Sequence, residues 1–214
     1  MKEIFELEGE ELWLLAQRAI YWPKERSLFI ADTHFGKVSH FRKHGIKVPS
    51  AAAQENLKSL EQLLYSTQAQ KVYFLGDLFH SEMNHEWLGF KQVIALFPKT
   101  EFHLIGGNHD ILDEVSYYKA RLILHPETLS LGPFLLSHEP LEDDFDGYNL
   151  CGHIHPAVRL KGNGRQSLRL TCFYFGAKQG ILPAFGTFTG SHTLKVKKED
   201  SVFVILEERV IQVA

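Results

Sequence analysis

The sequence is poor in three features that mark specialised classes of protein. It has two cysteines in 214 residues, too few for a small secreted domain held together by disulfides. No run approaches the ~18 consecutive apolar residues that a membrane-spanning helix needs. The formal net charge of -3 argues against a protein that coats nucleic acid through overall positive charge, although a local basic patch is compatible with it. Once these three classes are excluded, the composition is that of an ordinary globular protein.

The first ten residues are acidic and lack the apolar core of a secretory signal. We therefore expect a cytoplasmic protein that does not associate with membranes. Cys151 and Cys172 lie in strand-like runs and are expected to be buried free thiols. No linker, repeat or low-complexity segment is present, and the length suits a single α/β domain of roughly 200–250 residues. This predicts one domain over residues 1–214, with the oligomeric state open and a homodimer among the options.

Strands and helices alternate in the first half of the chain. Apolar runs predict an edge hairpin within residues 4–22 and central strands that begin at Leu28, Lys71 and Glu101. Helical spacing predicts helices over 50–66, with Ser50 as N-cap, and over 86–97. The stretch 37–47 is interpreted as a basic loop. This alternation is typical of βαβ units and a largely parallel sheet.

Short strands dominate after residue 120 and predict a second, mostly antiparallel sheet. They are expected at 122–125, 128–131, 134–137, 149–151, 157–160, 168–175, 193–197, 202–206 and 210–213, with a hairpin turn at Gly162-Asn163-Gly164. Two sheets packed face to face, with helices outside, is the assembly that these elements favour.

Apolar runs that end in potential metal ligands occur five times. The first, Leu28 to Lys37, delivers Asp32 and His34 at its carboxyl end. The others end at Asp77, at Asn108-His109-Asp110, at His138 and at His153-Ile154-His155. The carboxyl ends of strands in open α/β sheets are where ligands bind, so we expect these side chains to converge. Five such runs are hard to explain without a metal.

The ligand types indicate the kind of metal centre. Aspartate together with histidine suits Mn, Fe or Zn, whereas a site made only of carboxylates would suit Mg or Ca. The candidate ligands are too many for one ion but suit two ions that share a carboxylate. Two ions ~3.5–4 Å apart can stabilise both the attacking and the leaving oxygen of a phosphoryl displacement.

These blocks, in this order, resemble the calcineurin-like metallophosphoesterase superfamily. The resemblance implies a four-layer α/β/β/α sandwich of two mixed β-sheets flanked by helices, and two divalent ions. It assigns the ligands as Asp32, His34 and His155 for one ion, Asn108, His138 and His153 for the other, and Asp77 as the bridge. It also implies that hydroxide bridging the ions attacks phosphorus. His109 would then be the general acid or a phosphate contact, with Asp110 orienting it by a hydrogen bond.

The sequence around these motifs resembles the DNA-ligase-associated branch of that superfamily over roughly residues 10–190. The similar stretches are Asp32 to Lys37, His40 to Lys43, Gly45-Ile46, Gly76 to Ser81, and Leu182 to Gly190. Members of this branch are regarded as phosphodiesterases or nucleases linked with DNA repair. The resemblance thus implies functional links with a ligase, a helicase and an exonuclease.

Several residues beside the metal motifs have two interpretations. His80 either touches substrate or caps its own loop. The basic stretch that contains Lys37, Arg42 and Lys43 is either a phosphate-backbone contact or a solvated face. The cations Arg159, Lys161, Arg165 and Arg169 are interpreted as the polar face of a sheet.

The leading hypothesis is a dimetal phosphodiesterase or nuclease acting on nucleic acid, with manganese as the expected metal and iron or zinc as acceptable ones. The enzymatic alternative is a phosphomonoesterase or nucleotide hydrolase on the same scaffold. A third possibility, a scaffold subunit that has lost catalysis, is disfavoured because no ligand position is eroded.

Overall fold

The computed structural model describes residues 2–43, 45, 51–80, 84–142, 144–162, 166–187 and 189–214. The predicted cap at Ser50, the basic residues at 44 and 47, the turn at 163 and 164, and Arg165 lie outside the described residues. None of the described helices is long and apolar enough to cross a membrane.

The amino-terminal half builds the first sheet in chain order. Its strands lie side by side as β1 (Lys2–Leu7), β2 (Glu10–Leu15), β3 (Ala19–Trp22), β4 (Ser27–Ile30), β5 (Lys71–Leu75), β6 (Glu101–Ile105) and β7 (Leu122–His125). Neighbours from β1 to β4 are antiparallel, and those from β4 to β7 are parallel. The predicted edge hairpin and parallel central strands are confirmed.

The strand at Leu122–His125 belongs to this first sheet, so its prediction as part of the second sheet was wrong. It follows α4 (Glu114–Lys119), a short helix that the sequence did not reveal. Asp113 caps α4 by accepting a hydrogen bond from the Ser116 amide at 2.9 Å. The helix returns the chain so that β7 runs parallel to β6, as in any βαβ crossover.

The longer helices were predicted well, and a shorter one was missed. The helices expected over 50–66 and 86–97 are α2 (Ala51–Thr67) and α3 (His85–Ala95). The stretch interpreted as a basic loop instead forms α1 over Lys37–Lys43. This helix has no acidic residue in its own first turn, and the buried carboxylate of Glu86, on α3, accepts hydrogen bonds from the amides of Gly36 and Ser39 at 2.8 and 3.0 Å. A helix stabilised from a distant element leaves no local signal.

The carboxyl-terminal half builds the second sheet, mostly antiparallel as predicted. Its spatial order is β14 (His192–Thr193), β11 (Pro156–Lys161), β12 (Ser167–Phe175), β13 (Gln179–Ile181), β10 (Tyr148–Cys151), β9 (Phe134–Ser137) and β8 (Thr128–Leu131), with β15 (Ser201–Leu206) beside β12 and β16 (Arg209–Gln212) beside β15. Strands β9 and β10 pair in parallel, which places their carboxyl ends together.

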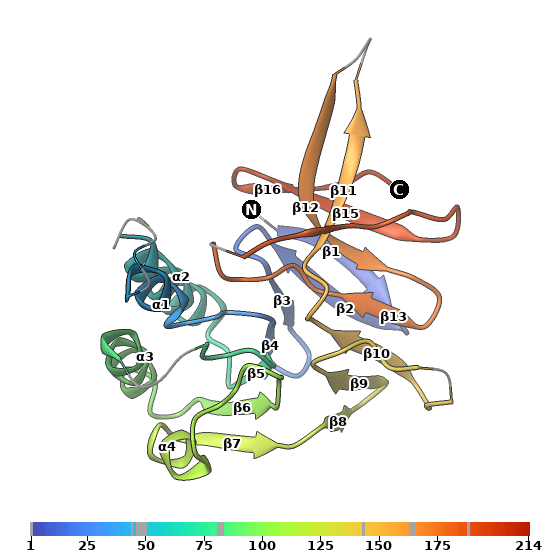
Figure 1. Ribbon diagram of the computed structural model, residues 1–214. Helices are drawn as coiled ribbons and strands as arrows, with labels where there is room; N and C mark the ends of the chain where they lie inside the picture. The colour runs from blue at the N-terminus through green and yellow to red at the C-terminus, as the bar shows by residue number, and fades with distance from the viewer. Residues whose placement is uncertain are drawn as a thin grey trace.

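The two sheets face each other, and the described helices lie against the first sheet (Figure 1). One buried cluster packs those helices on the first sheet, and a second fills the space between the sheets. The α/β fold with two mixed sheets and flanking helices is confirmed. A helical layer over the outer face of the second sheet, which the four-layer prediction includes, is not found among the described residues. That face buries a smaller cluster around Val158, Cys172 and Val202.

Both cysteines are buried free thiols, as expected from the sequence. They lie on different strands, Cys151 on β10 and Cys172 on β12. Burial raises the pKa of the Cys151 thiol far above its usual value and that of Cys172 to about 12. Neither sulfur is therefore a nucleophile near neutral pH.

Phe134 tests the importance of the core between the sheets. It is 1% exposed, and its ring centroid lies 5.2 Å from that of Trp22 on the opposite sheet. We expect Phe134→Ala to lower the free energy of unfolding by about 3–5 kcal/mol, because it leaves a cavity between the sheets. Urea denaturation measures this loss. Leu168→Ala, on exposed β12 surface, is the control and should change stability by about 0.5 kcal/mol at most. Equal losses in the two variants would contradict the packing described here.

Candidate metal centre

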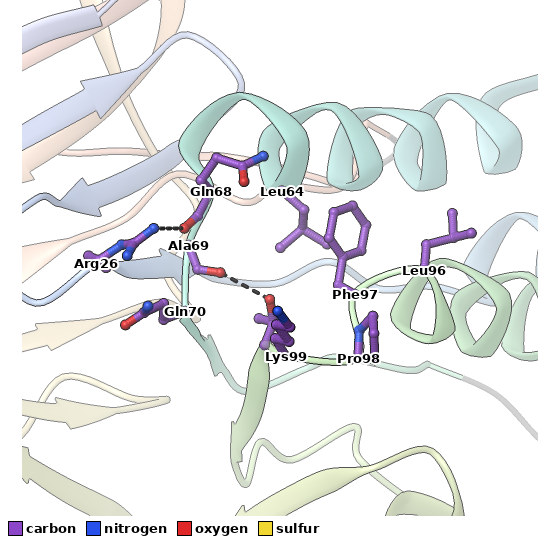
Figure 2. Close-up of a pocket in the computed structure, with 10 residues that line it drawn as sticks. Arg26, Leu64, Gln68, Ala69, Gln70, Leu96, Phe97, Pro98 and Lys99 are labelled. Carbon is purple, nitrogen blue, oxygen red and sulfur yellow. Dashed lines mark hydrogen bonds between the residues drawn. The ribbon is translucent and has the colours of Figure 1, made fainter.

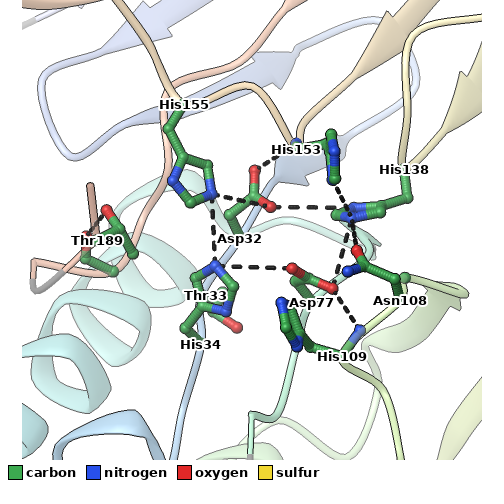
Figure 3. Close-up of polar contacts among 12 residues, drawn as sticks. Asp32, Thr33, His34, Asp77, Asn108, His109, His138, His153, His155 and Thr189 are labelled. Atoms are coloured by element: carbon green, nitrogen blue, oxygen red, sulfur yellow. Dashed lines mark hydrogen bonds and ion pairs between the residues drawn. The ribbon is translucent and has the colours of Figure 1, made fainter. Parts of the chain in front are cut away.

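The predicted ligands come from loops at the carboxyl ends of strands in both sheets. Asp32 and His34 follow β4, Asp77 follows β5, and Asn108 follows β6 in the first sheet; His138 follows β9, and His153 and His155 follow β10 in the second. Figure 3 shows these side chains pointing toward one another. The structure thus brings all seven together, although they span more than a hundred residues of sequence.

One group consists of Asp32, His34 and His155. The Nε2 atoms of the two histidines are 3.4 Å apart, and His155 Nε2 is 3.3 Å from Asp32 Oδ1. Both Asp32 and His34 are buried, and one ligand atom from each of the three residues lies within 4.8 Å of the others. This is the set that the resemblance assigns to one ion.

A second group surrounds His138. Its Nε2 lies 3.0 Å from Asn108 Oδ1, 3.1 Å from His153 Nδ1 and 3.4 Å from Asp77 Oδ1. The other carboxylate oxygen of Asp77 lies 3.7 Å from His34 Nε2, in the first group. Asp77 therefore stands between the two groups.

The hydrogen bonds of the histidine rings show whether the site presents lone pairs to a cation. His138 Nδ1 donates to the Leu75 carbonyl at 3.0 Å, and His155 Nδ1 donates to the Gly190 carbonyl at 3.1 Å. Each Nε2 then presents a lone pair to the carboxylates, which also carry lone pairs. Asp32 Oδ1 is buried without a hydrogen-bond partner among the described residues. Hydrogen-bond acceptors that are crowded together away from water destabilise the folded protein unless a cation lies between them.

The spacing of the atoms also suits metal ions. Ligand atoms bonded to one first-row ion at about 2.1 Å lie about 3.0–3.4 Å apart in octahedral or tetrahedral arrangements. The contacts of His138 Nε2 and His155 Nε2 described above fall within this range. The donor set and its spacing fit divalent metal.

In the first group, the surroundings of His34 favour its neutral form, whereas the Asp32 carboxylate favours positive charge at His155. Burial, followed by the nearby Lys37 ammonium and other imidazoles, lowers the pKa of His34 to about 2. A neutral His34 keeps a lone pair available for a metal. Burial also disfavours a charged His155, but the Asp32 carboxylate outweighs it and raises the pKa of His155.

The backbone at the ligands is strained. Among the described residues, Asp32, His34, Asp77, His153 and His155 have φ between 46° and 64°. Side chains other than glycine rarely adopt this left-handed conformation, which costs about 1–3 kcal/mol per residue. In the loops that these residues form, the candidate ligand side chains point toward one another (Figure 3).

Asp110 does not orient His109, so that part of the prediction was wrong. Its carboxylate accepts hydrogen bonds from the amides of Leu78 and Phe79, at 2.9 and 3.2 Å, and from Gly107 at 2.9 Å. It therefore ties the loop of Asp77 to the loop of Asn108. Burial raises the pKa of Asp110 to about 6 despite these donors. His109 is instead positioned through its own amide, which donates to Asp77 Oδ1 at 2.9 Å.

The predicted substrate contacts differ in how the structure places them. His80 lies in the cluster, with its ring centroid 4.1 Å from that of His109 and 5.3 Å from that of His34. Lys37 is partly buried and lines a small pocket with His34 and Thr189. Arg42 and Lys43 are exposed on α1. Sequence reasoning missed the carbonyls of Leu75 and Gly190, which accept from His138 and His155, because a backbone acceptor has no residue type.

A larger pocket lies away from these ligands. It has a volume of about 290 Å³ and lies among the ends of α2 and α3 and the segments that precede β4, β5 and β6 (Figure 2). The amino ends of parallel strands are opposite the edge that carries the cluster. The Arg26 guanidinium there donates to the Gln68 carbonyl at 3.4 Å, and Thr100 Oγ1 donates to the Ala69 carbonyl at 3.0 Å. Its polar contacts tie loops together and supply no catalytic group.

A two-sheet α/β fold with such a cluster at its strand ends defines a metal-dependent hydrolase of phosphoric esters. The chain belongs to the calcineurin-like phosphoesterase family, whose sequence profile matches residues 26–202. Members of the family use a centre of two metal ions. A search of curated proteins gives no match.

Solved structures with similar folds include a nuclease. The crystal structure of nuclease MPE from Pseudomonas putida is 30% identical over 100% of both chains, with a TM-score of 0.85. The phosphoesterase Yfce from E. coli is 15% identical over 88% of this chain and 98% of that chain, with a TM-score of 0.47.

Gly76 tests whether close packing holds the cluster. Its φ is +74°, and a Cβ at this position would overlap the His138 ring. We expect Gly76→Ala to displace His138 and to lower the amount of manganese retained after dialysis, measured by elemental analysis. Gly9→Ala is the matched control, with φ of +76° and nothing within 4 Å of its Cβ. Both variants should lose about 1–2 kcal/mol of stability from the backbone alone. Full metal retention by Gly76→Ala would contradict this role.

Proposed function

We propose that this protein is a dimetal phosphodiesterase that cleaves nucleic acid. The observation that carries the proposal is the convergence of lone pairs from five loops on two adjoining points, with the Asp77 carboxylate between them. We assign Asp32, His34 and His155 to one ion and Asn108, His138 and His153 to the other. Manganese is the metal we propose, and iron or zinc would accept the same ligands.

Two bound divalent ions would supply positive charge for the phosphoryl oxygens. They would also lower the pKa of a water molecule enough for it to lose a proton at neutral pH. The protein supplies the geometry. Asp77 lies between the two groups, and its Oδ1 also holds the His109 amide at 2.9 Å. Asp110 keeps these two loops at a fixed separation through three backbone amides.

His109 is placed to act on the substrate. Its amide is bonded to the candidate bridging carboxylate, and its ring lies beside the rings of His80 and His34, with centroids at 4.1 and 5.9 Å. A partly exposed imidazole at this position can donate a proton to the leaving oxygen or stabilise charge on the phosphoryl group. Lys37 adds a positive charge on the His34 side, where a phosphate oxygen would bind.

Two observations favour a nucleic-acid diester over a monoester. The similar structure of the P. putida protein is named as that of a nuclease, and it aligns over the whole chain. The sequence around the metal motifs also resembles the DNA-ligase-associated branch, so we extend the proposal to a role in DNA repair.

Substrate class is tested with manganese-loaded protein. We expect hydrolysis of bis(p-nitrophenyl) phosphate and of end-labelled single-stranded DNA, with little hydrolysis of p-nitrophenyl phosphate. A chelator should abolish turnover, because it removes the ions that would activate water and bind the phosphoryl oxygens. Turnover of the monoester alone would overturn the nuclease proposal and assign the protein to the phosphomonoesterases.

Two substitutions separate metal binding from proton transfer. His109→Ala should retain both ions, since its ring is not a ligand, and lose about 10²–10⁴-fold in kcat. Asp77→Asn should lose bound metal as well as turnover, because the charge between the two groups is removed. Elemental analysis and the diester assay measure the two effects.

His85→Ala, at an exposed histidine on α3, serves as the control and should retain both metal and turnover. Normal diester hydrolysis by either site variant would contradict the assignment.

A further inference from the structure

A segment of the chain carries a strong local positive charge. From Gly147 to Lys198 the sequence contains eight of the 23 lysines and arginines and none of the 26 acidic residues. The whole chain has a formal net charge of -3, so this segment stands apart from the rest. It begins just before the ligands His153 and His155 and includes the hairpin of β11 and β12.

That hairpin projects away from the body of the molecule (Figure 1). Strand β11 starts at Pro156, directly after His155. The hairpin is therefore anchored at the metal cluster and extends outward from it.

One face of the hairpin is basic and polar. The register pairs Ala157 with Thr171, Arg159 with Arg169, and Lys161 with Ser167. Alternation along a strand puts these residues on one face, while Val158 and Leu170 belong to an apolar cluster on the other face. Arg159, Lys161 and Arg169 are all exposed.

The direct pairing of Arg159 with Arg169 is unfavourable for the fold. Like charges opposite each other on neighbouring strands repel, and an acidic partner at either position would stabilise the hairpin. Arg159 contacts the Ser167 hydroxyl at 3.1 Å. The nearest acids along the chain are Asp146 before this segment and Glu199 and Asp200 after it. Of these, Asp200 accepts hydrogen bonds from the Tyr174 hydroxyl and the Lys197 amide. The two guanidinium groups thus face solvent beside each other.

The basic face leads into a pocket next to the metal cluster. Thr171, the neighbour of Arg169 on the same face, lines a pocket of about 140 Å³ together with His155, Arg18, Thr189 and Ser191. The guanidinium of Arg18 is held at its rim by the carbonyls of Ala184 and Gly186, both at 3.2 Å. Figure 3 shows Thr189 beside His155. Hydroxyl groups and a cation therefore continue the basic face as far as the ligand His155.

We infer that this face, from Arg18 and Thr171 at the pocket to Arg159, Arg169 and Lys161 on the hairpin, binds the backbone of a nucleic-acid strand outside the scissile phosphate. The inference rests on the proposed function for the position of the cleaved bond. From Ala157, opposite Thr171, to Lys161 the face extends over four residue steps of β11, or about 13 Å, which matches about four phosphates of a stacked strand. Its backbone contacts position the strand without reading its sequence.

The test compares R159E/R169E with K99E/K119E, which changes the net charge equally at exposed lysines on the helical side of the molecule. Binding of a fluorescein-labelled 12-nucleotide single strand is measured by anisotropy between 50 and 200 mM KCl. Each protein also carries His109→Ala, so that the probe is not cleaved. Turnover of bis(p-nitrophenyl) phosphate is measured in parallel without His109→Ala.

We expect R159E/R169E to weaken oligonucleotide binding at least tenfold and to reduce the salt dependence by about 1–2 units of log Kd per log salt concentration. Its kcat/KM for the small diester should stay within about twofold, because that substrate is too short to reach the hairpin. K99E/K119E should change both quantities little. Arg159→Glu alone should raise the melting temperature while weakening binding, which separates lost contacts from lost fold.

Equal oligonucleotide affinities for R159E/R169E and K99E/K119E would overturn the inference. So would binding to phosphatidylserine vesicles that depends on Arg159 and Arg169 while oligonucleotide affinity is unaffected. Failure of the proposed function has a different signature, since the unsubstituted protein would then hydrolyse neither diester. Hairpin-dependent oligonucleotide binding in that case would still support the inference.

Discussion

Mutual crowding of acceptor atoms is the constraint on which the rest of this structure depends. Two carboxylates, an amide oxygen and imidazole nitrogens approach one another to 3.0–3.4 Å at several points. Such an arrangement is unfavourable in a protein interior unless cations neutralise it. The two apolar clusters that fix the sheets and helices supply the rigidity that holds the ligand loops in place.

The loops meet this constraint through strained and tightly packed backbone. Left-handed residues turn the ligands toward the centre, and glycines let the loops approach closely: a Cβ on Gly152, for example, would lie 2.5 Å from Asp32 Oδ2. The carboxylate of Asp110 joins the loop of Asp77 to the loop of Asn108. The carboxylate of Glu86 accepts a hydrogen bond from the amide of Gly36, in the segment that follows His34. Backbone strain is tolerated where the surrounding contacts determine the conformation more strongly than local preference does.

Charge outside the centre is arranged on a longer scale. The acids are absent from the segment that contains the hairpin, and the repulsive pair of Arg159 and Arg169 weakens the hairpin locally. A polyanion that lies along the hairpin would relieve this repulsion, in the same way that metal ions would relieve the crowding of the ligands. Both features lower the stability of the free protein, a pattern expected where function opposes folding.

The sequence by itself determined which candidate ligands are present and which strands they follow, because apolar runs that end in Asp, Asn or His are local patterns. Those patterns were sufficient for the central strands, the two longer helices and the order of the motifs. Only the tertiary structure decided which elements lie next to one another. The helix α1 depends on a carboxylate from α3, the strand at Leu122–His125 joins the first sheet through α4, and Asp110 bonds to backbone amides of another loop. The cations interpreted as a polar sheet face form one continuous face because β11 and β12 pair in the register that puts Arg159 opposite Arg169 and Ala157 opposite Thr171, which lines the pocket at His155. Contacts between residues distant in sequence set these outcomes, and local preference carries no information about them.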